Sequence, residues 1–375
     1  MTRRPPAAAT RRVGVEHEYQ LFDRQGSVDA RTLWPTLALD GARLDPGDAN
    51  AVRCRWGGVV TTDGREAEIA TPPRRVGERG IDDAAVLADA GAAALRAALP
   101  DGISMRGYST HLNVEVDDRR GRSIARSIAE RMSPALMLLL DRADSPGLLV
   151  RPRHRRLEVA GEFQRGEALV GALTMTAGVV LATEAAGRHR TRGSLPPKLA
   201  LRLVPSPQRY GWYVDRRAGG EDLYGRGRDA VLRTTAGTTI SGQQVLESVW
   251  AVARAFIADH VGAAALDAVD GAVVGTRALP CEGAGDAPLV VEASLPTPEC
   301  AVLERRRRGR VSLMTATATW HAVALRAELD GVVRWIRVPG ERADEFFVAL
   351  DRGDLDEWLP SIFARRRRDV LGWVR

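Results

Sequence analysis

Cysteine and lysine are nearly absent from this 375-residue chain. The three cysteines, Cys54, Cys281 and Cys300, are too few and too scattered for a disulfide framework or a C-x-x-C metal site. Lys198 is the single lysine, and the chain contains no G-x-x-x-x-G-K-[ST] segment, which excludes a Walker-type phosphate loop. No persuasive Ser–His–Asp or Cys–His set indicates covalent catalysis.

Long uninterrupted apolar runs are missing as well. The longest run, residues 168–186, is broken by three threonines and a glutamate, which predicts a buried helix and not a membrane span. The first twelve residues lack the apolar core of a secretory signal. We therefore expect a reduced, cytoplasmic protein with no membrane partner.

The net charge of +6 is modest, and four of the positive charges lie within the first twelve residues. Nearly all basic residues are arginine, which together with abundant alanine and glycine indicates GC-rich codon usage more than a nucleic-acid surface. Two arginine runs, 305–308 and 365–368, could contact phosphates, but such runs usually form solvated faces beside helices. We expect no specific nucleic-acid partner.

Strands and helices are mixed in the predicted order without regular βαβ alternation. Strands are expected at 11–22, 54–71, 102–118 and 287–296, and helices at 80–100, 121–141, 164–188, 241–260, 311–329 and 354–371. The stretch 190–240, rich in Gly, Pro, Arg and Tyr, is expected to be a loop or flap. This mixture predicts an α+β fold with a largely antiparallel sheet, formed by one domain over 11–375 after a disordered tail at 1–10.

The predicted strands each have one apolar and one polar face. Side chains alternate along a strand, so Glu16 and Glu18 project together, about 7 Å apart. Glu66 and Glu68 share a face in the same way, and Glu292 points away from its apolar neighbours in the late strand. An antiparallel sheet with one face in the core and one face lining a cleft has this pattern.

The strand at 110–116 shows the cleanest alternation. Its valines and leucine face one way, and His111, Asn113 and Glu115 face the other. A solvated face would also carry Lys, Arg, Thr and Gln, and that alternative stays open for each strand alone. Carboxylates with one imidazole are ligands that Mg²⁺ or Mn²⁺ would use together with phosphate, whereas zinc would want more His or Cys. Together the strands predict a metal-lined cleft.

Four segments, GVEHEYQLFD, EIATPP, THLNVEV and VVEASLP, occur in this order. They resemble the glutamate–cysteine ligase type of carboxylate–amine ligase, within the glutamine synthetase superfamily. The resemblance covers the sheet-forming parts of 11–120 and about 285–300. It implies a glutamine synthetase-like antiparallel sheet that forms a half-funnel active-site cleft, with helices packed on the outer face. ATP would enter from one end and the acid and amine from the other.

The resemblance also assigns roles to single residues. Glu18 and Glu68 would hold one metal ion. Glu16, His111 and Glu292 would hold a second metal ion, which bridges the ATP phosphates. Nucleotide binding is further expected to involve Glu16, Asn113 and Arg151.

One departure from the family pattern concerns the late strand. This strand commonly reads Glu-x-Arg in the family, with the arginine at the transferring phosphate, but here Glu292 is followed by Ala293 and Ser294. Either another arginine reaches the site, or phosphoryl transfer is weakened or lost. The candidate arginines are Arg151, Arg153, Arg209 and Arg217, of which Arg153 and Arg209 are predicted to be catalytic.

The activity implied is an ATP-dependent ligation with Mg²⁺ or Mn²⁺. An amino-acid carboxylate, by analogy glutamate, would be joined to an amine through an acyl-phosphate, so the expected partners are a small-molecule acid and amine. Three other readings stay open: a guanidino-kinase-like phosphotransferase, a catalytically impaired nucleotide-binding pseudoenzyme, and, from the arginine runs, a basic nucleic-acid-binding protein. The superfamily often builds its sites near subunit contacts, which leaves a homo-oligomer open.

Overall fold

The computed structural model describes residues 11–45, 47–189, 195–206, 211–283, 306–308, 311–320, 322–329, 332–338, 340–352, 354 and 357–358. These residues belong to two compact units. The first unit is Met1–His17, Arg74–Ala85 and Gly107–Leu289, and the second is Glu18–Pro73, Val86–Arg106 and Val290–Arg375. The single catalytic domain expected over 11–375 stays a prediction.

The first unit is built on a sheet whose strands follow the order β11-β12-β9-β10-β8-β1. The bounds are β1 (Arg12–Asp23), β8 (Ser104–Glu115), β9 (Gly147–Arg153), β10 (Arg156–Glu162), β11 (Leu203–Ser206) and β12 (Gly211–Asp215), with β7 (Arg74–Arg75) beside the start of β1. Pairing is antiparallel between β10 and β8, β10 and β9, β12 and β9, and β11 and β12. The expected α+β class with antiparallel pairing is confirmed, and the half-funnel shape stays a prediction.

The two faces of this sheet differ as predicted. Leu112 and Val114 on β8 and Leu157 and Val159 on β10 are completely buried on the apolar face. Helix α3 (Asp118–Arg131) packs on this face, because a Cβ added at Gly121 would lie 3.6 Å from Val116 and 3.7 Å from Pro152. The opposite face, called the polar face below, carries the alternate residues of the same strands.

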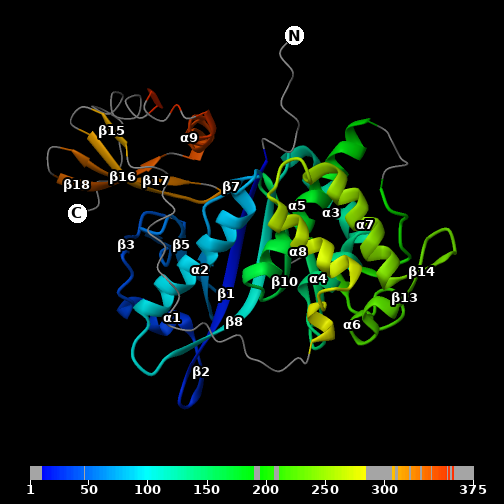
Figure 1. Cartoon of the computed structure of the whole chain (residues 1–375). Coiled ribbons are helices and arrows are strands. Elements are labelled where there is room, and N and C mark those ends of the chain that lie inside the picture. Colours follow the sequence, from blue (N-terminus) through cyan, green and yellow to red (C-terminus); the bar gives the residue numbers. More distant parts are fainter. Residues whose placement is uncertain are drawn as a thin grey trace, which may run out of the picture. The chain divides into compact units, whose positions relative to one another are not determined.

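A layer of helices completes the first unit, and Figure 1 shows α3, α4, α5, α7 and α8 gathered together, coloured from teal to yellow. Besides α3 these are α4 (Ser133–Leu140), α5 (Gly166–His189), α6 (Leu223–Arg226), α7 (Gly242–Ile257) and α8 (Ala263–Val274). Ser241 caps the start of α7: its hydroxyl accepts a hydrogen bond from the backbone N–H of Gln244 at 3.1 Å. Helix α5 passes close to α7, since a Cβ at Gly178 would lie only 2.8 Å from Ala253.

One helix is long and apolar enough to cross a membrane by length and composition. It is Gly166–Gly187 within α5, and 83% of its most apolar window is buried inside the protein. Burial of this extent is typical of a core helix, as the interrupted apolar run predicts.

The second unit contains two sheets. The strands of the first sheet follow the order β1-β6-β5-β4-β3, and β1 also pairs with β2. Their bounds are β2 (Gly26–Val28), β3 (Gly41–Ala42), β4 (Val52–Cys54), β5 (Val59–Asp63) and β6 (Glu66–Ala70). The second sheet has the order β15 (Arg306–Arg308), β16 (Val311–Ala318), β17 (Val323–Leu329) and β18 (Val332–Val338). Helices α1 (Ala30–Leu33), α9 (Gly340–Arg352) and part of α2 (Gly80–Ala98) complete the unit.

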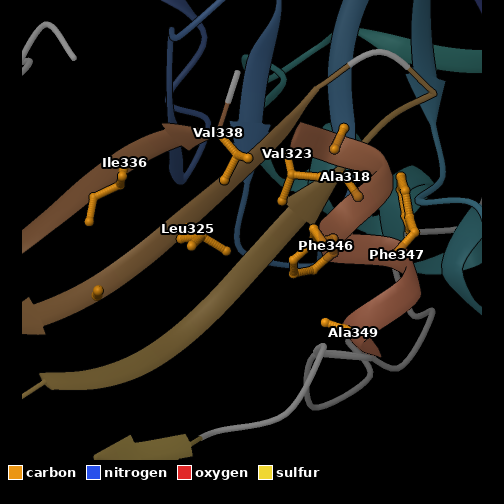
Figure 2. Close-up of a cluster of buried hydrophobic side chains, with 10 residues drawn as sticks. Ala318, Val323, Leu325, Ile336, Val338, Phe346, Phe347 and Ala349 are labelled. Carbon is orange, nitrogen blue, oxygen red and sulfur yellow. The ribbon is translucent and has the colours of Figure 1, made fainter. Parts of the chain in front are cut away.

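The helix predicted over 311–329 is wrong, because β16 and β17 occupy this stretch. Buried Val323, Leu325 and Ala327 follow a period of two, and they pack with Ile336 and Phe346 under α9 (Figure 2). A short apolar run of alanine, leucine and valine is compatible with the period of a helix and with that of a strand. Here the residues of β17 pair with β18, which makes this part of the run a strand.

Three other expectations about the chain can be compared with the structure. The predicted helix 121–141 is divided into α3 and α4, because Pro134 begins the second helix. The predicted loop 190–240 contains β11, β12, α6, β13 (Val231–Arg233) and β14 (Thr239–Ser241), so it is partly regular. The predicted strand 287–296 and most of the predicted helix 354–371 lie outside the described residues.

A buried carboxyl group lies at the end of α4 in the first unit. Asp141 is completely buried and accepts hydrogen bonds from the backbone N–H of Glu162, at 3.1 Å, and from the hydroxyl of Tyr224. Burial raises the pKa of Asp141 to about 7, although the bond from Tyr224 opposes this. The folded protein therefore holds this proton over a pH range in which the unfolded chain has released it.

This carboxyl group predicts a pH dependence of stability. Because the folded pKa is raised, the contribution of Asp141 to the free energy of unfolding falls by up to about 1.4 kcal/mol per pH unit as pH rises from 4 towards 7, then levels off. Buried His17, with a folded pKa lowered to about 3, contributes a slope of the opposite sign, so the Asp141 slope is the difference between wild type and Asp141→Asn in the free energy of unfolding by urea between pH 4 and 8. The control Asp259→Asn, at an exposed site in the same unit, should keep the wild-type slope. An Asp141→Asn variant with the wild-type slope contradicts the assignment.

Candidate active site

The polar face of the first unit carries a connected set of charged side chains. Register places Arg156 opposite Glu115 and Arg153, while Glu158 lies opposite Asn113. Cross-strand partners in an antiparallel pair point to the same side of the sheet, so these side chains share the polar face. We call the following residues the arginine–glutamate array: Glu16, Arg151, Arg153, Arg156 and Glu158.

Glu16 lies between two nitrogen groups from neighbouring strands. Its Oε2 is 3.5 Å from His111 Nδ1, and its Oε1 accepts Arg156 Nη2 at 3.3 Å. On its other side the His111 ring nitrogen Nε2 lies 3.2 Å from the hydroxyl of Ser109. The carboxylate of Glu16 is thus approached from both sides by groups that favour its negative charge.

The electrostatics of Glu16 follow from these neighbours. Burial would raise its pKa, but the hydrogen bond with His111 and the positive charge of Arg156 outweigh burial and lower the pKa to about 2. Glu16 is therefore ionised at any physiological pH. An ionised carboxylate beside an imidazole is a donor set that suits a hard divalent cation with phosphate.

Glu158 organises the arginines at the other end of the array. Its side chain is completely buried, and its two oxygens pair with Arg151 and, at 2.9 Å, with Arg153 Nε. Two guanidinium groups against one carboxylate leave a net positive charge here. Guanidinium groups of fixed geometry recognise phosphate and carboxylate oxygens, so this end of the array suits an anionic substrate.

Carboxylates from the second unit form a group of their own. Glu18, Asp63 and Glu68 each present an oxygen such that the three atoms lie within 4.8 Å of one another. Glu18 is nearly buried, whereas Asp63, at the end of β5, is exposed. We call these residues the carboxylate cluster. Like charges this close repel unless a cation neutralises them, and carboxylate oxygens are the ligands that Mg²⁺ prefers.

The structure brings together several residues named from the sequence. Glu16, His111, Asn113, Arg151 and Arg153 meet on the polar face, and Glu18 meets Glu68 in the carboxylate cluster. Glu292 and Arg209, predicted as a metal ligand and a catalytic arginine, lie outside the described residues.

Other candidates have structural roles. Arg217 is 68% exposed and pairs with Asp222 at 3.3 Å, so it belongs to a surface ion pair and not to the array. Glu115 is paired with Arg12 at 3.4 Å. His17 is a core histidine: the centroid of its ring lies 4.7 Å from that of Phe163, and burial lowers its pKa to about 3.

Two residues of the arginine–glutamate array and the carboxylate cluster, Arg156 and Asp63, were not predicted from the sequence as site residues. Arg156 lies in RRLEVAGE, where it alternates with buried Leu157 and Val159, and this period of two was the available signal for a strand. Asp63 precedes the Gly64 turn between β5 and β6, and antiparallel pairing across that turn returns Glu68 towards it.

Comparison with known proteins yields few relatives. No family model matches the chain, and no curated protein matches it. Among solved structures the chain is similar to the ligase PafA in complex with the prokaryotic ubiquitin-like protein Pup, with a TM-score of 0.46 and 13% identity over 72% of this chain and 64% of that one. It is also similar to PafA in complex with ADP, with a TM-score of 0.41 and 13% identity over 65% and 61%. The chain spans less than two thirds of both, and a likeness at this level carries no argument about activity.

The carboxylate cluster predicts metal-dependent stability. Mn²⁺ should raise the Tm of the protein because it relieves repulsion within the cluster, and Asp63→Asn should reduce that rise by about half or more at the same Mn²⁺ concentration. Asp101→Asn, an exposed aspartate of the second unit outside the cluster, should leave the rise unchanged. Equal shifts in the wild type and Asp63→Asn would show that Mn²⁺ acts elsewhere.

Proposed function

We propose that this protein is an ATP-dependent carboxylate–amine ligase that works with Mg²⁺ or Mn²⁺. The observation that carries the proposal is the polar face of the first unit, where ionised Glu16 contacts His111 beside arginines fixed by buried Glu158. Metal ligands and phosphate-recognising groups on adjacent strands are what phosphoryl transfer needs, since it depends on positioning and charge neutralisation.

The residues that would hold metal ions fall into two sets. Glu16 and His111 form one set, and the carboxylate cluster forms the other; Glu16 and Glu18 are two positions apart on β1. Oxygen donors with one imidazole fit Mg²⁺ or Mn²⁺ better than zinc. When bound, the metal ions would supply positive charge to the phosphate oxygens of the nucleotide. Glu292 and Arg209 stay candidates from the sequence.

The residues of the array would bind and orient the reactants. Arg151 and Arg153 would hold phosphate oxygens, and Asn113 would fix the groups around Glu16. A carboxylate oxygen of the acid attacks the γ-phosphorus as the bond to the β,γ-bridging oxygen breaks, which releases ADP and forms an acyl-phosphate. The amine nitrogen then attacks the acyl carbon, phosphate leaves, and the nitrogen loses a proton to give the amide.

The substrate class is less constrained than the reaction type. Glutamate is the acid suggested by the resemblance in the sequence, and the amine is open. PafA is named as the ligase of the protein Pup, so a panel of acceptors should include protein-borne as well as small amines. A phosphotransferase acting on a guanidino group would give a phosphorylated product and no amide, and a pseudoenzyme would bind nucleotide without turnover.

The activity can be tested by ADP release from ATP with Mg²⁺ or Mn²⁺, over a panel of acids crossed with amines. A ligase should release ADP only when an acid and an amine are both present, and mass spectrometry should find one condensed product per ADP. Nucleotide binding without release for any pair would instead support the pseudoenzyme. A phosphorylated guanidino compound would support the phosphotransferase.

Single substitutions on the polar face test the site itself. Glu16→Gln and His111→Ala should each weaken metal-dependent ATP binding by at least about tenfold while the fold stays intact, because each removes a metal donor. Glu184→Gln is a matched control, since it alters another buried glutamate–arginine pair of the first unit, with Arg11 at 2.8 Å. It should cost stability and keep ATP binding, measured by calorimetry. Full ATP affinity in both polar-face variants would remove the basis for this site.

A further inference from the structure

Arg156 connects the two strands on either side of β8. Its side chain is only 10% exposed; Nε donates to Asn113 Oδ1 at 2.7 Å, and Nη2 donates to Glu16 Oε1 at 3.3 Å. The guanidinium therefore has a short bond to a neutral amide and a longer bond to a charged carboxylate.

The contact of Arg156 with Glu16 is the weaker of the two by geometry. Charge-assisted bonds between guanidinium and carboxylate groups are usually about 2.7–2.9 Å long. Both contacts of the Glu16 carboxylate are longer than this, at 3.3 Å to Arg156 and 3.5 Å to His111. Asn113 thus fixes the guanidinium, while Glu16 is held loosely and can exchange partners.

The arginines at the other end of the array are held differently. Arg151 and Arg153 pair with Glu158, which is completely buried. If they left it, a carboxylate without solvent would lose its compensating charges, which is strongly unfavourable. Glu16 is partly exposed, and a divalent cation can replace Arg156 as its positive partner. Arg156 can therefore leave its carboxylate partner without leaving a fully buried carboxylate uncompensated.

We propose that Arg156 exchanges its carboxylate partner for the terminal phosphate of a nucleoside triphosphate. Without ligands it holds Glu16 in place; when a divalent cation binds Glu16, the guanidinium, still fixed by Asn113, pairs with an oxygen of the γ-phosphate. The guanidinium stays protonated throughout, so no proton moves and one anionic oxygen replaces another. The inference rests on the proposed function and adds the residue that distinguishes a triphosphate from a diphosphate.

This exchange has two consequences of opposite sign. Without nucleotide Arg156 competes with the cation for Glu16, so its removal should strengthen the binding of metal alone. With nucleotide it contributes a bond to the γ-phosphate that ADP cannot accept, so its removal should weaken ATP binding and leave ADP binding nearly unchanged. A residue that only supports the fold would weaken the binding of metal, ATP and ADP together.

The test uses the full chain with Mn²⁺ as the metal probe. Free Mn²⁺ is measured by electron paramagnetic resonance, and ATP and ADP binding with Mn²⁺ by calorimetry. In Arg156→Gln we expect the ratio of ADP to ATP dissociation constants to fall about tenfold or more, while Mn²⁺ alone binds more tightly. Arg156→Lys, which keeps a charge but not the planar guanidinium, should retain part of the ATP preference. Arg11→Gln, at the separate buried pair with Glu184, should keep the wild-type ratio.

The outcomes distinguish this inference from the proposed function. An unchanged ATP preference in Arg156→Gln overturns the exchange and leaves the ligase proposal standing. Equal losses of metal, ATP and ADP binding in that variant would assign Arg156 a purely structural role, which also overturns it. A wild-type protein that shows no metal-dependent nucleotide binding would overturn the proposed function, and the inference with it.

Discussion

The alternation of side chains on β1, β8 and β10 is the constraint on which the candidate site depends. Leu112, Val114 and Leu157 are completely buried on one side of the sheet, so the residues between them must lie on the other. A slip of one residue in register would turn charged groups into the core and leucines to the polar side, which makes the register strongly specified. The placement of Arg156 opposite Glu115, and of His111 opposite Ala160, follows from the same register.

The charges on this polar face balance one another in part. Each glutamate described on it has at least one cationic neighbour: Glu16 has Arg156, Glu115 has Arg12, and Glu158 has two arginines. Paired charges reduce the penalty of burial, although they do not add much stability on their own. The face therefore combines anionic and cationic groups, with a fully buried carboxylate at Glu158 and a partly exposed one at Glu16.

Local pattern and long-range pairing account for what the sequence could and could not predict. Glu16, Glu18, Glu68 and His111 were predictable because each belongs to a strand with clear alternation, which is a property of neighbouring residues. Arg156 required knowledge of how β10 pairs with β8, which are far apart in the chain. Asp63 and Glu68 belong to one local hairpin, and only their meeting with Glu18 on β1 depends on distant segments. The helix wrongly predicted over 311–329 has another origin: the apolar run fits either period, and the pairing of β16 with β17 and of β17 with β18 makes it two strands.

Under the proposed function, the near absence of lysine has a chemical meaning. An acyl-phosphate is an acylating agent, and any accessible amine close to it competes with the intended acceptor. Guanidinium groups stay protonated and are poor nucleophiles. A polar face that carries arginines and no lysine would therefore resist such self-acylation. The only side-chain amine of the chain, Lys198, is paired with Glu130 at 3.0 Å, away from the polar-face residues described above.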